Sequence, residues 1–231
     1  MPFEIPIFPL NTVLFPSMAL PLHIFEPRYR LMIRRCLEAD RQFGVALISD
    51  GEEGQSDAFP SLVGTVAQIT ETMPFPDGRM NIQTVGRRRF RLLDLREEDE
   101  YFIGTVDWLD DVSGELSAPA WAAKVRRILG RYLALLTGNT HVSGVNLDEL
   151  SVPHEPETLS MAVGALLTIP NDQKQDLIEM TSTAARLSYE FALLRRAEVT
   201  QLAFARRLAD GLENPPFEEA LGPAARYVSF N

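Results

Sequence analysis

Lysine is scarce in this chain, which holds only Lys124 and Lys174 among its 231 residues. The phosphate-binding loop of nucleotide hydrolases needs a glycine directly before its lysine. Alanine precedes Lys124 and glutamine precedes Lys174, so the sequence contains no such loop. No two glycines lie two positions apart, which also excludes the glycine fingerprint of dinucleotide-binding domains. The sequence therefore predicts no nucleotide site.

Reactive and metal-binding side chains are equally sparse. Cys36 is the only cysteine, so it cannot form an internal disulfide, and we expect a reducing, cytoplasmic environment. His23, His141 and His154 are scattered, and neither a zinc-binding H-E-x-x-H nor a nucleophilic G-x-S-x-G motif occurs. We expect no catalytic residue, no cofactor and no metal. A hydrolase that uses an unrecognised pair of carboxylates stays as a remote alternative.

Charge of one sign dominates, with 32 acidic and 22 basic residues and a formal net charge of −10. An acidic surface repels phosphate backbones and anionic lipids, which argues against nucleic acid and membranes as partners. Residues 5–25 carry no charge, but four prolines in this stretch exclude a membrane helix. The first residues lack the basic start of a signal peptide. We expect a soluble protein.

Residues 3–109 are rich in short apolar runs separated by proline and glycine, which is typical of strands. We expect strands or fragments of strands at residues 5, 7–8, 13–15, 18–25, 43–49, 63–75, 79–85, 88–95 and 101–109. The strongest hairpin signal is the turn sequence PDG at 76–78. One helix should begin at Pro27, where an apolar stripe starts that contains Tyr29, Met32, Ile33, Cys36 and Leu37.

The pattern becomes helical after residues 110–114. Trp121, Val125, Ile128, Tyr132 and Leu135 recur at steps of three and four, as along the seam of a packed helix. Further helices are expected from Pro156, from an N-cap at Asn171 and over residues 184–211. We therefore predict an α+β chain: a closed antiparallel β-domain at 1–112, a helical bundle at 117–211 and a tail at 212–231.

Several motifs occur together in one order. They are IFPL at 7–10, VLFP at 13–16, LPLHIFEPRY at 20–29, FGV at 43–45, PDGR at 76–79, GRRRFR at 86–91, QDLIE at 175–179 and RL at 186–187. In this order they resemble the N-terminal, substrate-binding domain of the Lon (La) ATP-dependent protease family. The resemblance implies a PUA-like β-barrel followed by a helical bundle. It also implies a stand-alone protein-binding module, without the ATPase and peptidase modules of Lon.

Candidate binding residues lie at the hairpin and on the arginine-rich strand. Met73, Phe75 and Met80 flank the turn and suit contact with exposed apolar segments of other proteins, although folding back onto the core is the simpler reading. Arg87 and Arg89 can grip acidic peptides or phosphate, against the simpler reading that they neutralise nearby carboxylates. An RNA-binding PUA-like module is the alternative function. We expect His23 and Cys36 to be structural.

Overall fold

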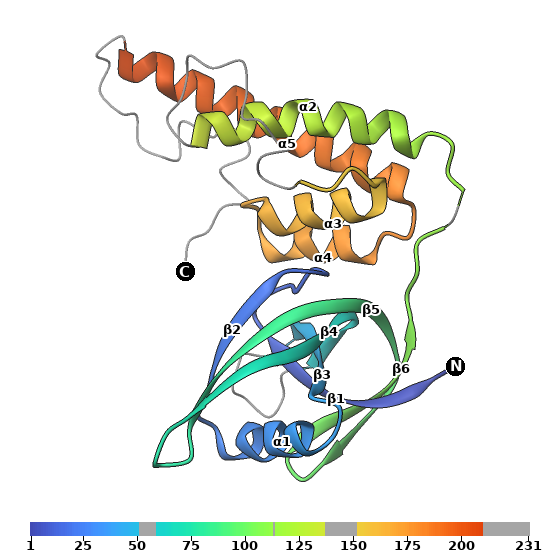
Figure 1. Cartoon of the computed structure of the whole chain (residues 1–231). Helices are drawn as coiled ribbons and strands as arrows, with labels where there is room; N and C mark the ends of the chain where they lie inside the picture. Colours follow the sequence, from blue (N-terminus) through green and yellow to red (C-terminus); the bar gives the residue numbers. More distant parts are fainter. Residues whose placement is uncertain (51–58, 113, 137–151, 210–231) are drawn as a thin grey trace. The chain divides into compact units, whose positions relative to one another are not determined.

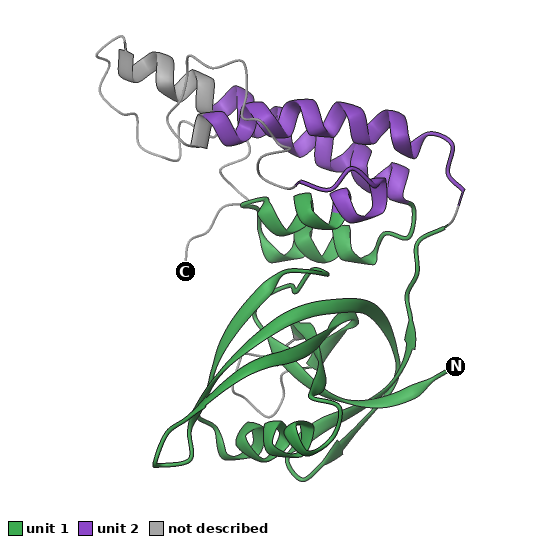
Figure 2. Ribbon diagram, in the orientation of Figure 1, with its two compact units in different colours: residues 1–113, 161–182 green, residues 114–160, 183–231 purple. Residues whose placement is uncertain are grey.

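The computed structural model describes residues 1–50, 59–112, 114–136 and 152–209. The chain forms two compact units (Figures 1 and 2). Unit 1 contains Met1–Ser113 and Met161–Ser182, and unit 2 contains Gly114–Ser160 and Thr183–Asn231. The predicted tail at 212–231 lies outside the described residues.

Unit 1 is built on one sheet of six strands: β1 (Phe3–Leu10), β2 (Ala19–Ile24), β3 (Gln42–Asp50), β4 (Phe59–Pro74), β5 (Met80–Glu98) and β6 (Tyr101–Trp108). Their order is β2-β5-β4-β3-β1-β6, and β6 also pairs with β5, so the pairings return to a strand already in the sheet. Five of the six pairs are antiparallel. The β1–β3 pair is parallel, which corrects the expectation of a wholly antiparallel sheet. A parallel return needs a long crossover, and β2 with α1 (Pro27–Glu38) supplies it.

Two strands are longer than the sequence indicated. β1 runs without a break through Pro6 and Pro9. Pro6 stays paired with β6 and Pro9 with β3, so neither proline interrupts the strand. The expected break between 79–85 and 88–95 does not exist, and β5 is a single strand of 19 residues. Gly86 lies where the break was expected. A Cβ there would overlap the carbonyl oxygen of Phe15, so glycine lets the segment before β2 lie directly on the strand.

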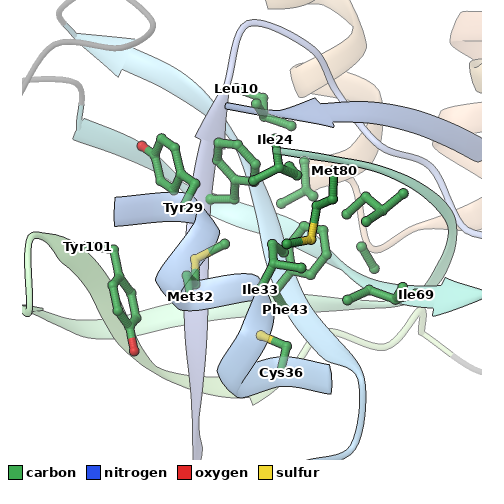
Figure 3. Close-up of a cluster of buried hydrophobic side chains, with 14 of the residues drawn as sticks. Leu10, Ile24, Tyr29, Met32, Ile33, Cys36, Phe43, Ile69, Met80 and Tyr101 are labelled. Carbon is green, nitrogen blue, oxygen red and sulfur yellow. The ribbon is translucent and has the colours of Figure 1, made fainter. Parts of the chain in front are cut away.

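The core of unit 1 lies between α1 and the strands (Figure 3). The predicted stripe is confirmed, because Tyr29, Met32, Ile33 and Cys36 are all buried against strand residues. Burial of one such apolar side chain contributes about 1.5–3 kcal/mol, so α1 is attached mainly by this face. A second cluster on the other part of the sheet contains Ile5, Ile7, Ala46, Val66, Phe90, Leu92 and Val106.

Helical residues 161–182 belong to unit 1, although the sequence placed the whole helical half in one bundle. They include the end of α3 (Pro156–Leu166) and all of α4 (Asn171–Glu179). Gln175 donates a hydrogen bond of 3.0 Å to the carbonyl oxygen of Val63, which ties α4 to β4. Asn171 is not the N-cap that the sequence indicated. Pro170 holds that position, and the Asn171 amide donates instead to the carbonyl oxygen of Asn11 at 2.9 Å.

Unit 2 contains α2 (Ala118–Leu136), α5 (Thr183–Ala209) and the first residues of α3. The rings of Trp121 and Phe191 lie 5.9 Å apart between α2 and α5, so Trp121 packs within the helices as expected. Val125, Ile128 and Tyr132 are buried along the predicted seam of α2, whereas the side chain of Leu135 lies outside the description. Among helices in the described ranges, none combines the length and hydropathy of a bilayer span.

Candidate functional site

The turn end of the β4–β5 hairpin projects from the sheet (Figure 1). It carries an exposed apolar surface. Met73 of β4 is opposite Asn81 of β5, and Asn81 is opposite His23 of β2. Side chains of directly opposed residues point to the same side of a sheet. Met73, Asn81 and His23 therefore form one row across three strands.

Two aromatic residues extend this row. Phe75 lies two residues after Met73 and Phe25 two residues after His23, so each continues on the same side. The His23 ring lies 6.0 Å from Phe25, nearly parallel, and 6.0 Å from Phe75, edge to face. We call the surface formed by Phe25, Met73 and Phe75 around His23 the hairpin patch. Its apolar members are substantially exposed, with fractions of 58% for Phe25, 65% for Met73 and 39% for Phe75.

Polar contacts hold the patch in shape. His23 Nδ1 and Asn81 Oδ1 form a hydrogen bond of 2.6 Å, which fixes the imidazole between the two phenyl rings. In the turn, the Asp77 carboxylate accepts hydrogen bonds from the backbone N–H of Arg79 at 3.0 Å and from its Nε at 2.7 Å. These bonds lower the pKa of Asp77, so its charge persists well into the acid range. Gly78 follows with a positive φ of 84°, which a glycine adopts without strain.

Met80 lies on the opposite side of the hairpin. It is opposite Ile24 and Pro74 in the sheet and is only 6% exposed, with its thioether among the core side chains (Figure 3). Met80 therefore folds back onto the core, which was the simpler interpretation of all three residues. Met73 and Phe75 do not fold back. The structure brings Met73 and Phe75 together on the surface and removes Met80 from it.

The arginine-rich part of β5 forms no continuous basic stripe. Arg89 is buried with its guanidinium against the Asp111 carboxylate, and Arg88 pairs at 2.6 Å with Asp110. Arg87 is exposed. Of the five candidate residues, only Met73 and Phe75 lie together, and Arg87 and Arg89 do not join them. The adjacent acidic residues Asp110 and Asp111 are thus both ion-pair partners of arginines.

Sequence reasoning missed the contribution of β2 to this surface. Phe25 and His23 were placed in an extended run, but nothing local indicated which strand would pair with it. The only available signal was their spacing of two, which places both on one side of a strand. In the parts of the chain that the structure describes, no group of three or more His, Cys, Asp or Glu side chains is arranged to hold a metal ion.

Comparison with known proteins agrees with the motifs in the sequence. The model of the ATP-dependent protease La (LON) substrate-binding domain matches residues 4–196. Lon protease of Escherichia coli strain K12 is 28% identical over 213 residues, which is 89% of this chain and 26% of that protein. Lon protease of Halothermothrix orenii is 24% identical over 77% of this chain and 23% of its own length. The chain thus spans about a quarter of these curated relatives.

Solved structures show the same fold. The Lon N-terminal domain protein from Xanthomonas campestris has a TM-score of 0.60 and 25% identity, covering 82% of this chain and 98% of that one. The N-terminal domain of Lon protease from the Mycobacterium avium complex has a TM-score of 0.66 and 17% identity, covering 84% and 98%. The mixed α+β prediction is confirmed at this level. The match over residues 4–196 means that the chain belongs to the Lon substrate-binding domain family.

Proposed function

We propose that this chain is a non-catalytic module that binds exposed apolar segments of other proteins through the hairpin patch. The observation that carries the proposal is the exposure of Phe25, Met73 and Phe75 at the projecting end of the hairpin. The family is described as a protease substrate-binding domain, which supports protein segments as the ligand class.

The chemistry of the patch suits ligands of variable sequence. A large apolar side chain that leaves water contributes about 1.5–3 kcal/mol, and this gain does not depend on its exact shape. The thioether of Met73 adapts to differently shaped partners. Phe25 and Phe75 present rigid rings, each with its centroid 6.0 Å from that of the His23 ring. One adaptable and two rigid contacts favour general recognition of apolar segments.

Other parts of our interpretation remain predictions. The return of the strand pairings to β5 supports a closed, PUA-like barrel. The domain limits at 1–112, 117–211 and 212–231 and action in the cytoplasm also stay predictions. The RNA-binding alternative gains no support, because Arg88 and Arg89 already face carboxylates.

Fluorescence anisotropy with a labelled, reduced and carboxymethylated protein as an unfolded ligand tests this proposal. We expect saturable binding, and the double variant Met73→Ser, Phe75→Ser should weaken it at least about tenfold. Leu93→Ser is the matched control, because Leu93 is an exposed apolar residue of β5 outside the patch, at 53% exposure. Equal losses in both variants, or no saturable binding by the unaltered protein, would refute the proposal.

A further inference from the structure

A pocket of about 350 Å³ lies between α1 and the inner side of the hairpin, within unit 1. Three of its residues come from one face of α1, at spacings of four and three, and the others come from the hairpin. The lining residues are Arg30, Arg34, Leu37, Thr72, Pro74, Gly78 and Met80. The pocket therefore combines two cationic groups with an apolar floor, and it opens on the side of the hairpin opposite to the hairpin patch.

Neither guanidinium group of the pocket forms an ion pair among the described residues, although the charge of Arg30 acts on the Asp77 carboxylate and helps to lower its pKa. Among the described residues, neither Arg30 nor Arg34 has a carboxylate within 4.0 Å, and Asp77 on the turn is engaged by Arg79. Arg34 Nε donates to the carbonyl oxygen of Arg30 at 3.2 Å, which leaves its terminal nitrogens available. Arg30 Nε is buried and has no hydrogen-bond partner in the described structure. A buried donor such as this one normally has a hydrogen-bond partner in a folded protein. An anionic group bound in the pocket would supply that partner.

The neighbouring strand edge is accessible to an extended chain. β3 pairs with β4 only as far as Gln68, and Ile69 bonds to the backbone of Arg41. From Thr70 to Pro74, β4 is paired on one side only, with β5, within the part of the sheet that the structure describes. Thr72 and Pro74 of this free edge line the pocket. A peptide that adds along such an edge would direct its end toward α1.

We propose that this pocket binds the carboxy-terminal residue of a protein chain when that residue is apolar. Its α-carboxylate would pair with Arg34 and Arg30, and its side chain would contact Leu37 and Met80. The proposal rests on one part of the function proposed above, that this chain binds protein segments, and it specifies one class of segment.

The size of the pocket favours a chain end over an internal acidic residue. A carboxy-terminal residue carries its carboxylate and its side chain on one Cα, so both fit one small hollow. In an extended internal segment, adjacent side chains point to opposite sides, and same-side neighbours lie about 7 Å apart. An internal acidic and apolar pair would therefore hold its two groups farther apart than the carboxylate and side chain of one terminal residue.

The test uses the full chain and three twelve-residue peptides that carry fluorescein at the amino terminus. The first ends in leucine with a free carboxylate, the second is its amide, and the third is an amide with an internal aspartate two residues before the leucine. We expect the free acid to bind at least about tenfold more tightly than either amide, as a charge-assisted hydrogen bond predicts. Arg34→Gln should abolish this difference. Arg91→Gln, an exposed arginine eleven residues beyond Met80 on β5, should retain it.

Each outcome decides between the two proposals. Equal affinities for acid and amide, an unchanged ratio in Arg34→Gln, or tight binding of the internal aspartate peptide would overturn the carboxylate pocket. If the hairpin patch variant Met73→Ser, Phe75→Ser still weakens all peptides in those cases, the proposed function stands. If the patch variant changes nothing while the acid retains its advantage, the pocket stands and the patch proposal fails. Absence of binding by every peptide would refute both.

Discussion

Arg89 and Asp111 form an ion pair in which both side chains are only 3% exposed. The same guanidinium donates through Nη1 to the carbonyl oxygens of Ile178 at 2.7 Å and Met180 at 2.8 Å. These carbonyls lie at the C-terminal end of α4. The last carbonyl groups of a helix have no N–H partner within the helix, and the negative end of the helix dipole favours a cation there. One arginine of β5 thus joins the segment after β6 to the end of α4.

Replacement of Arg89 by methionine should destabilise the protein by about 3–5 kcal/mol, because Asp111 would remain buried without its cation. Arg88→Met is the matched control. The Arg88–Asp110 pair has side-chain exposures of 49% and 63%, so we expect a loss below about 1 kcal/mol. Urea denaturation followed by circular dichroism measures both. Similar losses for the two variants would show that the buried pair has no special role.

Met80 and Met73 should differ sharply when each is truncated. Met80→Ala removes a buried side chain from the core and should lower the free energy of unfolding by about 2–5 kcal/mol. Met73→Ala should change it by no more than about 0.5 kcal/mol, because the side chain is mostly in water. Thermal and urea unfolding test the difference, and the opposite ranking would contradict the register of the hairpin.

Gly164→Ala should destabilise unit 1 although alanine is the better helix former by about 1 kcal/mol. A Cβ at this position of α3 would overlap Cε1 of Phe15, whose side chain is fully buried. Overpacking of this kind costs about 1–3 kcal/mol, so the clash outweighs the gain in propensity. Phe15→Leu in the same chain should recover part of the loss. A more stable single variant would show that the ring can shift.

Cys36 should be inert in the folded chain. Burial, with a smaller contribution from Asp40, raises the pKa of Cys36 to about 12, so the reactive thiolate is absent near neutral pH. We expect no reaction with a thiol reagent at about pH 8 until urea unfolds the protein. Rapid labelling without urea would contradict this prediction.

The same thiol should make stability depend on pH in the alkaline range. Above its ordinary pKa of about 8.5 the unfolded chain loses the proton while the folded chain keeps it. The contribution of Cys36 is therefore complete below that pKa and declines as the pH rises toward about 12. Urea denaturation at about pH 8 and about pH 10 should show a smaller loss for Cys36→Ala than for the unaltered chain.

The sequence predicted those elements that are specified by a local pattern of residues, such as an apolar stripe or a turn motif. The stripe of Tyr29, Met32, Ile33 and Cys36 specified both the helix and its buried face, and the structure confirms it. The turn at 76–78 correctly indicated a hairpin. These features depend on residues close together in the chain.

Register and distant partners were not predictable in the same way. Met80 is opposite Pro74 and not Met73, and a shift of one residue would move its side chain to the other side of the sheet. The amino-acid composition around the turn does not indicate which of the two registers forms. Arg89 bonds to residues 89 and 91 positions away, so its neighbours in the sequence carry no sign of its burial.

The chain passes between its two units three times, after residues 113, 160 and 182. No single proteolytic cut can therefore separate unit 1 from unit 2, because a fragment that stops near residue 112 lacks the stretch that supplies Gln175 and the carbonyls bound by Arg89. In such a fragment the carbonyl group of Val63 would lose its hydrogen bond from Gln175. The Arg89 guanidinium would lose the two carbonyl groups that accept its hydrogen bonds. A minimal expressible piece of this family member must extend at least through residue 182.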